Sequence, residues 1–390
     1  MTQQEKAYSY LEQYHSEMIS LWEEFVRLES PSAVPEAIDE VARHLDTYCR
    51  ALGMATDKFK VEGSGACVEA ETQVTGDLSP ILFLGHIDTV HPIGSFPGGP
   101  WSIREDGWVY GPGVHDCKGG LIIALYVIRA LQHAGYDKRK LKLLVVGDEE
   151  VGHATSKMKS VDFLRKHAAG CAAAFTFESG SMNGDIVTRR KGGGNIKMTV
   201  DGIASHCGRA PKDGASAIRE AARKIVAIED LTDYDNLLFN CGKISGGTAV
   251  NTIPAHCSVD ICIRFLTNAD KDRGLAALQA ICDKVETPNT KCTVGPMMGF
   301  PSMEETEKTG ELVALYQDAC ESLGLDRPAE LHESGCSDSA YTTSMGIPTL
   351  CGVGVRGTGN HSINEHADPA SLLTQAKKLV ATILSMPDTF

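Results

Sequence analysis

The feature that most constrains this sequence is a set of short apolar runs that end at glycine or at acidic residues. The run Pro80–Leu84 ends at Gly85, and His86 and Asp88 follow it directly. An apolar run of this length without polar alternation is typical of a buried strand. On extended chain, side chains two residues apart leave the same face, so His86 and Asp88 point the same way. A histidine and a carboxylate at a strand end can serve as a metal ligand and its orienting partner.

Two later apolar runs end in the same manner. Residues 141–146 lead into the acidic segment Asp148–Glu150, and residues 172–177 lead into Glu178. Strands that alternate with helices predict an α/β domain, in which ligands gather at the strand ends. A glycine-rich turn also delivers Asp116 to the start of an apolar helix. A charged residue flanked by glycines at a helix start is placed there by backbone geometry rather than by packing.

Length and composition limit the class of protein. A chain of 390 residues exceeds one ordinary core, so we expect two domains. The net charge of −14 without a basic stripe argues against nucleic acid and anionic membranes as partners, and no apolar run approaches the length of a membrane span. The N-terminal residues lack a signal-peptide pattern, and thirteen cysteines without a Cys-x-x-Cys pair favour reduced thiols in the cytoplasm.

The order of expected elements divides the chain into segments. The N-terminal part begins with a helix over 5–29 and a second over 35–52, before a hairpin-like region. After a glycine-rich hinge at 189–194, the expected order β-α-β-β-α-β is that of a ferredoxin-like module. We therefore predict an α/β domain in two parts, over 1–190 and 296–390, with an inserted module over 191–295.

Seven polar residues that follow apolar strands or lie at glycine turns indicate a metal site. Two imidazoles and five carboxylates without a cysteine suit zinc or another divalent metal. One zinc needs three or four ligands, so this many acids favours two metals with a bridging carboxylate. Each signal alone is weak, because an acidic pair usually lies on the solvated surface. An explanation by ordinary structural roles must, however, account for all seven residues independently. The seven are His86, Asp88, Asp116, Glu149, Glu150, Glu178 and His361.

Five ordered motifs resemble those of one enzyme family. The motifs are His86–Val90, Gly113–Gly120, Asp148–Gly152, the stretch from Gly246 to Pro254, and His361–Glu365. In this order they resemble the di-zinc metallopeptidases that include bacterial glutamate carboxypeptidase, aminoacylase, acetylornithine deacetylase and succinyl-diaminopimelate desuccinylase. The resemblance covers nearly the whole chain and is closest to glutamate carboxypeptidase. It implies a zinc-exopeptidase-like catalytic domain, a mixed sheet between helices, with an inserted ferredoxin-like lid and dimerisation domain.

The resemblance also implies two Zn²⁺ ions per subunit, with Co²⁺ or Mn²⁺ as alternatives. One zinc would be held by His86, Glu178 and a shared Asp116, and the other by Glu150, His361 and the same Asp116. Asp88 would orient His86, and Glu149 would act as general base and acid. Three departures from the usual pattern remove no ligand. They are Cys117, His153, which stands where a serine is common, and Cys207.

Three residues of the inserted module complete the implied site. Asn251 and Arg264 resemble the pair that grips the terminal carboxylate of the substrate, which an arginine fork binds bidentately. His206 resembles a histidine that donates a hydrogen bond to the oxyanion of the reaction in the neighbouring subunit. The resemblance thus implies a homodimer that forms through the inserted domain.

The residues alone leave two main classes open, a metal-dependent amide hydrolase and a non-catalytic metal-binding receptor for small ligands. Glu149 discriminates between them, because a binding site has no need for an uncoordinated acid beside its ligands. A structural interaction protein would not need five acids at strand ends and turns. We expect an exopeptidase that hydrolyses the amide bond to a C-terminal amino acid with a free carboxylate, acting on small peptides. An N-acyl-amino-acid deacylase, with N-acyl amino acids as substrates, or a dipeptidase is the alternative.

Overall fold

The computed structural model describes residues 1–390 and divides the chain into two compact units. The first unit comprises Met1–Arg189, Glu304–Glu333 and Ser337–Phe390, and the second comprises Arg190–Met303 and Ser334–Cys336. The second unit runs past residue 295 because β15 (Met298–Phe300) pairs with β9 (Gly192–Asp201). No helix of the structure is both long enough and apolar enough to cross a membrane.

An eight-stranded sheet in the order β1-β2-β6-β3-β7-β17-β8-β16 forms the frame of the first unit. Four neighbouring strands, β6, β3, β7 and β17, run parallel to one another, whereas β1, β2 and β8 pair antiparallel. The predicted mixed α/β class is therefore confirmed. The strands are β1 (Ala55–Phe59), β2 (Cys67–Glu71), β3 (Leu78–His86), β6 (Arg139–Val146), β7 (Ala173–Thr176), β8 (Ile186–Arg190), β16 (Glu330–Glu333) and β17 (Thr349–Cys351).

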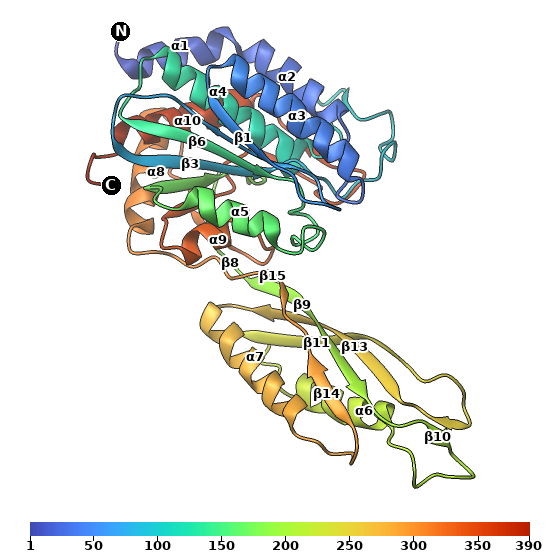
Figure 1. Cartoon of the computed structure of the whole chain (residues 1–390). Coiled ribbons are helices and arrows are strands. Elements are labelled where there is room, and N and C mark those ends of the chain that lie inside the picture. The colour runs from blue at the N-terminus through green and yellow to red at the C-terminus, as the bar shows by residue number, and fades with distance from the viewer. The chain divides into compact units, whose positions relative to one another are not determined.

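Helices cover both faces of this sheet (Figure 1). Helices α1 to α4 and α10 lie on one face, and α5 and α9 lie on the other. Helix α4 is buried along almost its whole length because its residues are nearly all apolar. The bounds are α1 (Gln3–Gln13), α2 (His15–Arg27), α3 (Pro35–Ala51), α4 (Gly119–His133), α5 (Lys159–Ala168), α8 (Thr309–Ser322), α9 (Ser339–Ser344) and α10 (Ser371–Ser385).

The parallel strands place the polar residues of the site at one edge of the sheet. His86 pairs in register with Val146, and Leu84 pairs with Thr176. Because the carboxyl ends of parallel strands meet at the same edge, the residues that follow these strands gather there. Helix α4 approaches this edge closely, because a Cβ at Gly120 would lie 2.0 Å from the carbonyl oxygen of Phe177. Glycine at the helix start thus brings Asp116 up to the strand end.

The single helix expected over residues 5–29 is wrong, since the structure has α1 and α2 in its place. The chain breaks at Tyr14, whose φ of −103° and ψ of 12° depart from helical values. At the break, the rings of Tyr10 and Tyr14 lie 4.4 Å apart, and both face the guanidinium of Arg129 at 5.5 Å. Cation–π packing around Arg129 therefore accompanies the change of direction.

The long loop expected over residues 91–115 contains short strands that join two distant parts of the sequence. These strands, β4 (Ser102–Ile103) and β5 (Val109–Tyr110), form a four-stranded sheet with β18 (Gly357–Thr358) and β19 (His366–Ala367). The segment that precedes Asp116 is thereby fixed to the segment that carries His361.

The second unit has the strand order β11-β13-β9-β14, in which all the pairs are antiparallel. Its main elements follow the order β-α-β-β-α-β along the chain, and α6 and α7 pack with the sheet around a separate apolar core. The glycine-rich stretch expected as a hinge is strand from Gly192 onward. The elements are β9, α6 (Ala217–Glu229), β11 (Leu237–Gly246), β13 (His256–Phe265), α7 (Asn268–Asp283) and β14 (Lys291–Val294), with β10 (Ser205–His206) and β12 (Thr252–Ile253) as a separate pair.

Candidate metal centre

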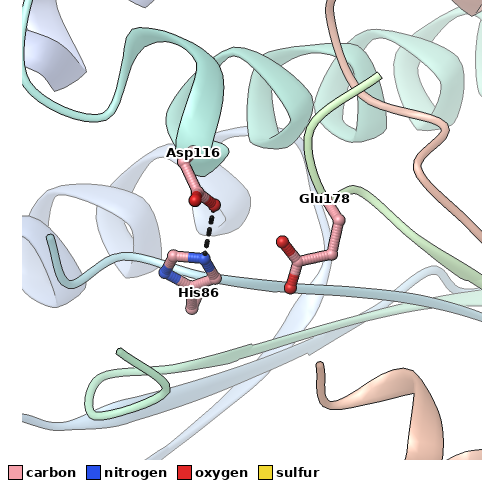
Figure 2. Close-up of side chains that lie close together, drawn as sticks. All are labelled: His86, Asp116 and Glu178. Atoms are coloured by element: carbon pink, nitrogen blue, oxygen red, sulfur yellow. Dashed lines mark hydrogen bonds and ion pairs between the residues drawn. The ribbon is translucent and has the colours of Figure 1, made fainter. Parts of the chain in front are cut away.

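One group of potential ligands forms around the end of β3. His86, Asp116 and Glu178 offer ligand atoms that all lie within 4.8 Å of one another, and all three residues are buried (Figure 2). His86 Nε2 lies 3.3 Å from Asp116 Oδ1. The Oγ of Ser337 donates a hydrogen bond of 3.1 Å to Glu178 Oε1 and so holds this carboxylate in place.

A second group shares Asp116 with the first. Asp116, Glu150 and His361 again offer ligand atoms that lie within 4.8 Å of one another. His361 Nε2 lies 3.1 Å from Glu150 Oε2 and 3.5 Å from Asp116 Oδ2. Asp116 therefore turns one carboxylate oxygen to each group, as a carboxylate that bridges two cations must.

The turn that carries Asp116 is positioned by Glu365, which is almost fully buried. One oxygen of Glu365 accepts the N–H groups of His115 and Asp116 at 2.8 and 3.0 Å, and the other accepts the N–H of Gly113 at 3.1 Å. His91 Nε2 lies 2.9 Å from the same carboxylate. Glu365 lies in a motif that the sequence singled out, but only the folded chain shows what the residue does.

Asp88 serves mainly the acidic turn after β6. Its carboxylate accepts the N–H groups of Glu149 and Glu150 at 3.1 Å each, together with the hydroxyl of Ser32 at 2.7 Å. The nearest atom of Asp88 to His86 Nδ1 is the main-chain oxygen at 3.0 Å, and the carboxylate lies at 3.5 Å. The orienting partner of the histidine is thus first a carbonyl group, while the carboxylate of Asp88 fixes the neighbouring acids.

Glu149 is buried beside the two groups but belongs to neither. Burial, reinforced by the negative charge of Glu178, raises the pKa of Glu149 well above its ordinary value. A buried acid with a raised pKa is suited to take up and return a proton, which is what general acid–base chemistry requires. The adjacent Glu150 instead faces His361, and burial raises its pKa to about 7.

The residues present fit divalent cations. For Asp116, hydrogen bonds from His361 and His86 outweigh the effect of burial and lower the pKa of its carboxyl group, so this group is ionised. Hydrogen bonds to Asp116 and Glu150 raise the pKa of His361 to about 10, which marks the negative charge that a cation would neutralise. Two imidazoles and three carboxylates form the nitrogen and oxygen donor set that zinc and related metals accept.

Comparison with known proteins identifies the family. A model of peptidase family M20/M25/M40 matches residues 82–385. The chain belongs to this family. Carboxypeptidase G2 of Pseudomonas sp. (strain RS-16) is 27% identical over 354 residues, which cover 88% of this chain and 83% of that one. Succinyl-diaminopimelate desuccinylase of Cupriavidus taiwanensis is 27% identical over 374 residues, which cover 90% of this chain and 94% of the relative.

The fold agrees with this assignment. The M20 family metallo-carboxypeptidase Sso-CP2 from Sulfolobus solfataricus superimposes with a TM-score of 0.74 over 94% of this chain and 98% of that one, at 18% identity. The family resemblance stated from the motifs is confirmed. The M20/M25/M40 chain is accordingly a hydrolase of peptide or acyl amide bonds.

The remaining predicted residues of this M20/M25/M40 peptidase lie in the second unit. His206 is exposed in β10, and its Nδ1 accepts the N–H groups of Gly208 and Arg209 at 3.1 and 3.2 Å. Because Nδ1 is the acceptor, the neutral ring carries its proton on Nε2, which is thus a hydrogen-bond donor. The main-chain oxygen of Asn251 accepts the N–H of Cys207 at 3.0 Å, so Asn251 lies beside β10.

Arg264 lies on β13, opposite Gly193 of β9. A Cβ at Gly193 would lie 2.1 Å from Arg264 Nη1, so only glycine leaves the guanidinium its present place. The same Nη1 lies 3.4 Å from Cys336 Sγ. The side chain therefore crosses its neighbouring strand in a defined direction, and no sequence pattern predicted this contact with Cys336.

Proposed function

We propose that this chain is a di-zinc exopeptidase that hydrolyses the amide bond to a C-terminal amino acid with a free carboxylate. The observation that carries the proposal is the shared Asp116, which turns one oxygen to each of two ligand groups, with Glu149 buried beside both and part of neither. A metal-binding receptor on the same scaffold would not need this free acid. The structure therefore favours the enzyme over the receptor.

The chemistry divides between the cations and the chain. When bound, divalent cations lower the pKa of a coordinated water and polarise a carbonyl oxygen. Glu149 accepts a proton from the attacking water and passes it to the leaving amine. The N–H groups of Glu149 and Glu150 are fixed on Asp88, so the base and its neighbouring ligand keep a constant separation.

Substrate choice rests on the carboxylate of the leaving amino acid. Carboxypeptidase G2 is by its name a carboxypeptidase, and Arg264 of this chain offers a planar fork for a carboxylate. The desuccinylase relative favours the alternative of an N-acyl-amino-acid deacylase. A substrate panel assayed with Zn²⁺ or Co²⁺ distinguishes the exopeptidase from the deacylase. The panel contains dipeptides, N-acyl amino acids and the C-terminal amides of both. Cleavage of amidated substrates as fast as of free acids would contradict the proposal.

Arg264→Lys is expected to raise KM strongly for substrates with a free carboxylate. Lysine keeps the charge but lacks the planar fork that binds both carboxylate oxygens, so it orients the carboxylate of the substrate less well. Steady-state kinetics with an acid substrate and its amide measure the effect, and the amide should remain equally poor for both proteins. Arg273→Lys is a matched control, because Arg273 is an exposed arginine of the same unit that pairs only with Asp270. Unchanged KM for acid substrates would remove Arg264 from the site.

We further propose that the second unit serves as lid and dimerisation domain, and that His206 Nε2 donates to the oxyanion in the neighbouring subunit of a homodimer. Loss of such a donor costs about 2.7–4 kcal/mol of transition-state stabilisation. Inactive His206→Ala and inactive Glu149→Gln proteins should therefore regain activity after subunit exchange, because one site of the mixed dimer is complete. No recovery in mixed dimers of demonstrated composition would show that His206 does not act across the interface.

A further inference from the structure

His153 is fully buried behind the turn that carries Glu149 and Glu150, and the chemistry described above does not use it. Its two ring nitrogens face two different acids. Nδ1 lies 3.2 Å from Asp148 Oδ1, and Nε2 lies 2.7 Å from Asp338 Oδ1. Both acids are themselves buried. Ionised carboxylates are costly to bury without a counter-charge, so a positive group between two of them stabilises both.

The two acids, rather than the nearby hydroxyl groups, decide where the protons of this ring lie. Ser156 Oγ donates to the main-chain oxygen of His153 at 3.1 Å and shares a hydrogen bond of 2.8 Å with Ser160 Oγ. His153 Nδ1 lies 2.9 Å from Ser160 Oγ and 3.2 Å from Asp148 Oδ1. Because an ionised carboxylate can only accept a hydrogen bond, the contact with Asp148 places a proton on Nδ1. The short contact of Nε2 with Asp338 places a proton there as well.

Asp338 depends on this histidine. Its Oδ1 is the atom in contact with His153, and its Oδ2 is buried and makes no hydrogen bond. Burial would lower the pKa of His153, but the charge of Asp338 and the bonds to both acids raise it to about 10. A positively charged ring also agrees with the geometry, because each ring nitrogen faces a carboxylate oxygen.

The two acids belong to the two sides of the metal centre. Asp148 immediately precedes Glu149, and its Oδ2 accepts the N–H of Ser156 at 2.9 Å, which closes the turn after β6. Asp338 immediately follows Ser337, the residue that donates to Glu178. His153 thus connects the segment that carries Glu149 and Glu150 with the segment that holds Glu178.

We propose that His153 is a positioning residue: as an imidazolium it binds Asp148 and Asp338 together and so holds Glu149 and Glu150 in register with Glu178. This inference rests on the proposed function of the same site, because the spacing it sets is that of the proposed ligands and base. His153 belongs to neither ligand group. It acts through the two acids and the backbone of their segments.

His153→Gln tests this role, because glutamine can contact one acid but supplies no charge. Competition with a chromophoric chelator should show weaker Zn²⁺ binding by about 10–100-fold, as is typical when a residue that orients ligands is lost. At saturating Zn²⁺ kcat should fall with KM unchanged, since the carboxylate grip is untouched. His167→Gln is the matched control, because His167 also lies against an acid, Glu69 at 3.5 Å, but neither residue belongs to a ligand group. Zn²⁺ affinity and kcat equal to those of wild type would overturn the proposal.

Nuclear magnetic resonance gives a readout that does not depend on activity. In metal-free wild-type protein labelled with ¹³C and ¹⁵N, His153 should show protons on both ring nitrogens at neutral pH, and its ring signals are assigned by through-bond correlation to its own backbone. A ring with only one proton would overturn the proposal that His153 is an imidazolium between Asp148 and Asp338, and this holds even where His153→Gln fails to fold. Asp338→Asn, which changes charge without changing shape, should also weaken Zn²⁺ binding. Absence of Zn²⁺ binding by the wild-type chain would instead refute the proposed function, whereas the ring signals would still decide the charge of His153.

Discussion

Glu149→Gln is expected to keep its fold and its bound metal but to lose about 10²–10⁴-fold in kcat, because an amide cannot accept and return a proton. Glutamine closely matches glutamate in shape, and Glu149 lies outside both ligand groups. Its main-chain N–H, which bonds to Asp88, is unaffected by the substitution. Steady-state kinetics on the best substrate of the panel, with metal analysis of the same preparation, measures both quantities.

The neighbouring Glu150→Gln is the matched variant, because the chemical change is identical and only the position differs. Glu150 Oε2 faces His361 at 3.1 Å, so its loss should empty the second ligand group. Metal analysis should then show fewer bound ions than in Glu149→Gln. If Glu149→Gln loses metal and Glu150→Gln retains it, the two roles are reversed.

Chelation is expected to abolish activity, and added Zn²⁺ or Co²⁺ is expected to restore it. Titration of the metal-free protein should reach full activity at two ions per chain. Asp116→Asn should weaken both binding steps at once, because the two oxygens of Asp116 face different ligand groups. Asp57→Asn, at an exposed position of β1, serves as the control and should bind as wild type does.

The two-metal proposal requires not only that chelation abolishes activity but also that the active protein binds two ions per chain. Fully active protein that holds at most one tightly bound ion per chain would refute it. An Asp116→Asn variant that loses one binding step and keeps the other unchanged would show that this carboxylate is not shared. Circular dichroism of each sample separates these results from unfolding.

The gathering of the ligands could be predicted because it depends on local signals. Apolar runs without alternation predicted the central strands, and the parallel pairing of β3 with β6 and β7 brings their ends to one edge. The residues after those ends therefore meet for a reason that strand patterning can reveal. His86 and Glu178 are placed in this way.

Other parts of the site could not be predicted because they depend on contacts between distant segments. Glu365 binds the turn of Asp116 from the position directly before β19, which pairs with β5, and strands of two residues have no recognisable periodicity. The break at Tyr14 was equally hidden, since Leu11 and Met18 continue the apolar face across it. His153 was noticed as an unusual residue, but its two partners lie 5 and 185 positions away.

The place of β17 in the sheet bears on how the protein is made. This strand lies between β7 and β8, yet it comes from Thr349–Cys351, after the whole second unit has been synthesised. A nascent chain that has reached Met303 holds His86, Asp116, Glu150 and Glu178, but it lacks β16 and β17 of their sheet and the carboxylate of Glu365. The second unit has most of its residues in one continuous stretch and is complete in sequence first. Most of the candidate ligands are therefore synthesised well before the strand and the carboxylate that complete their surroundings.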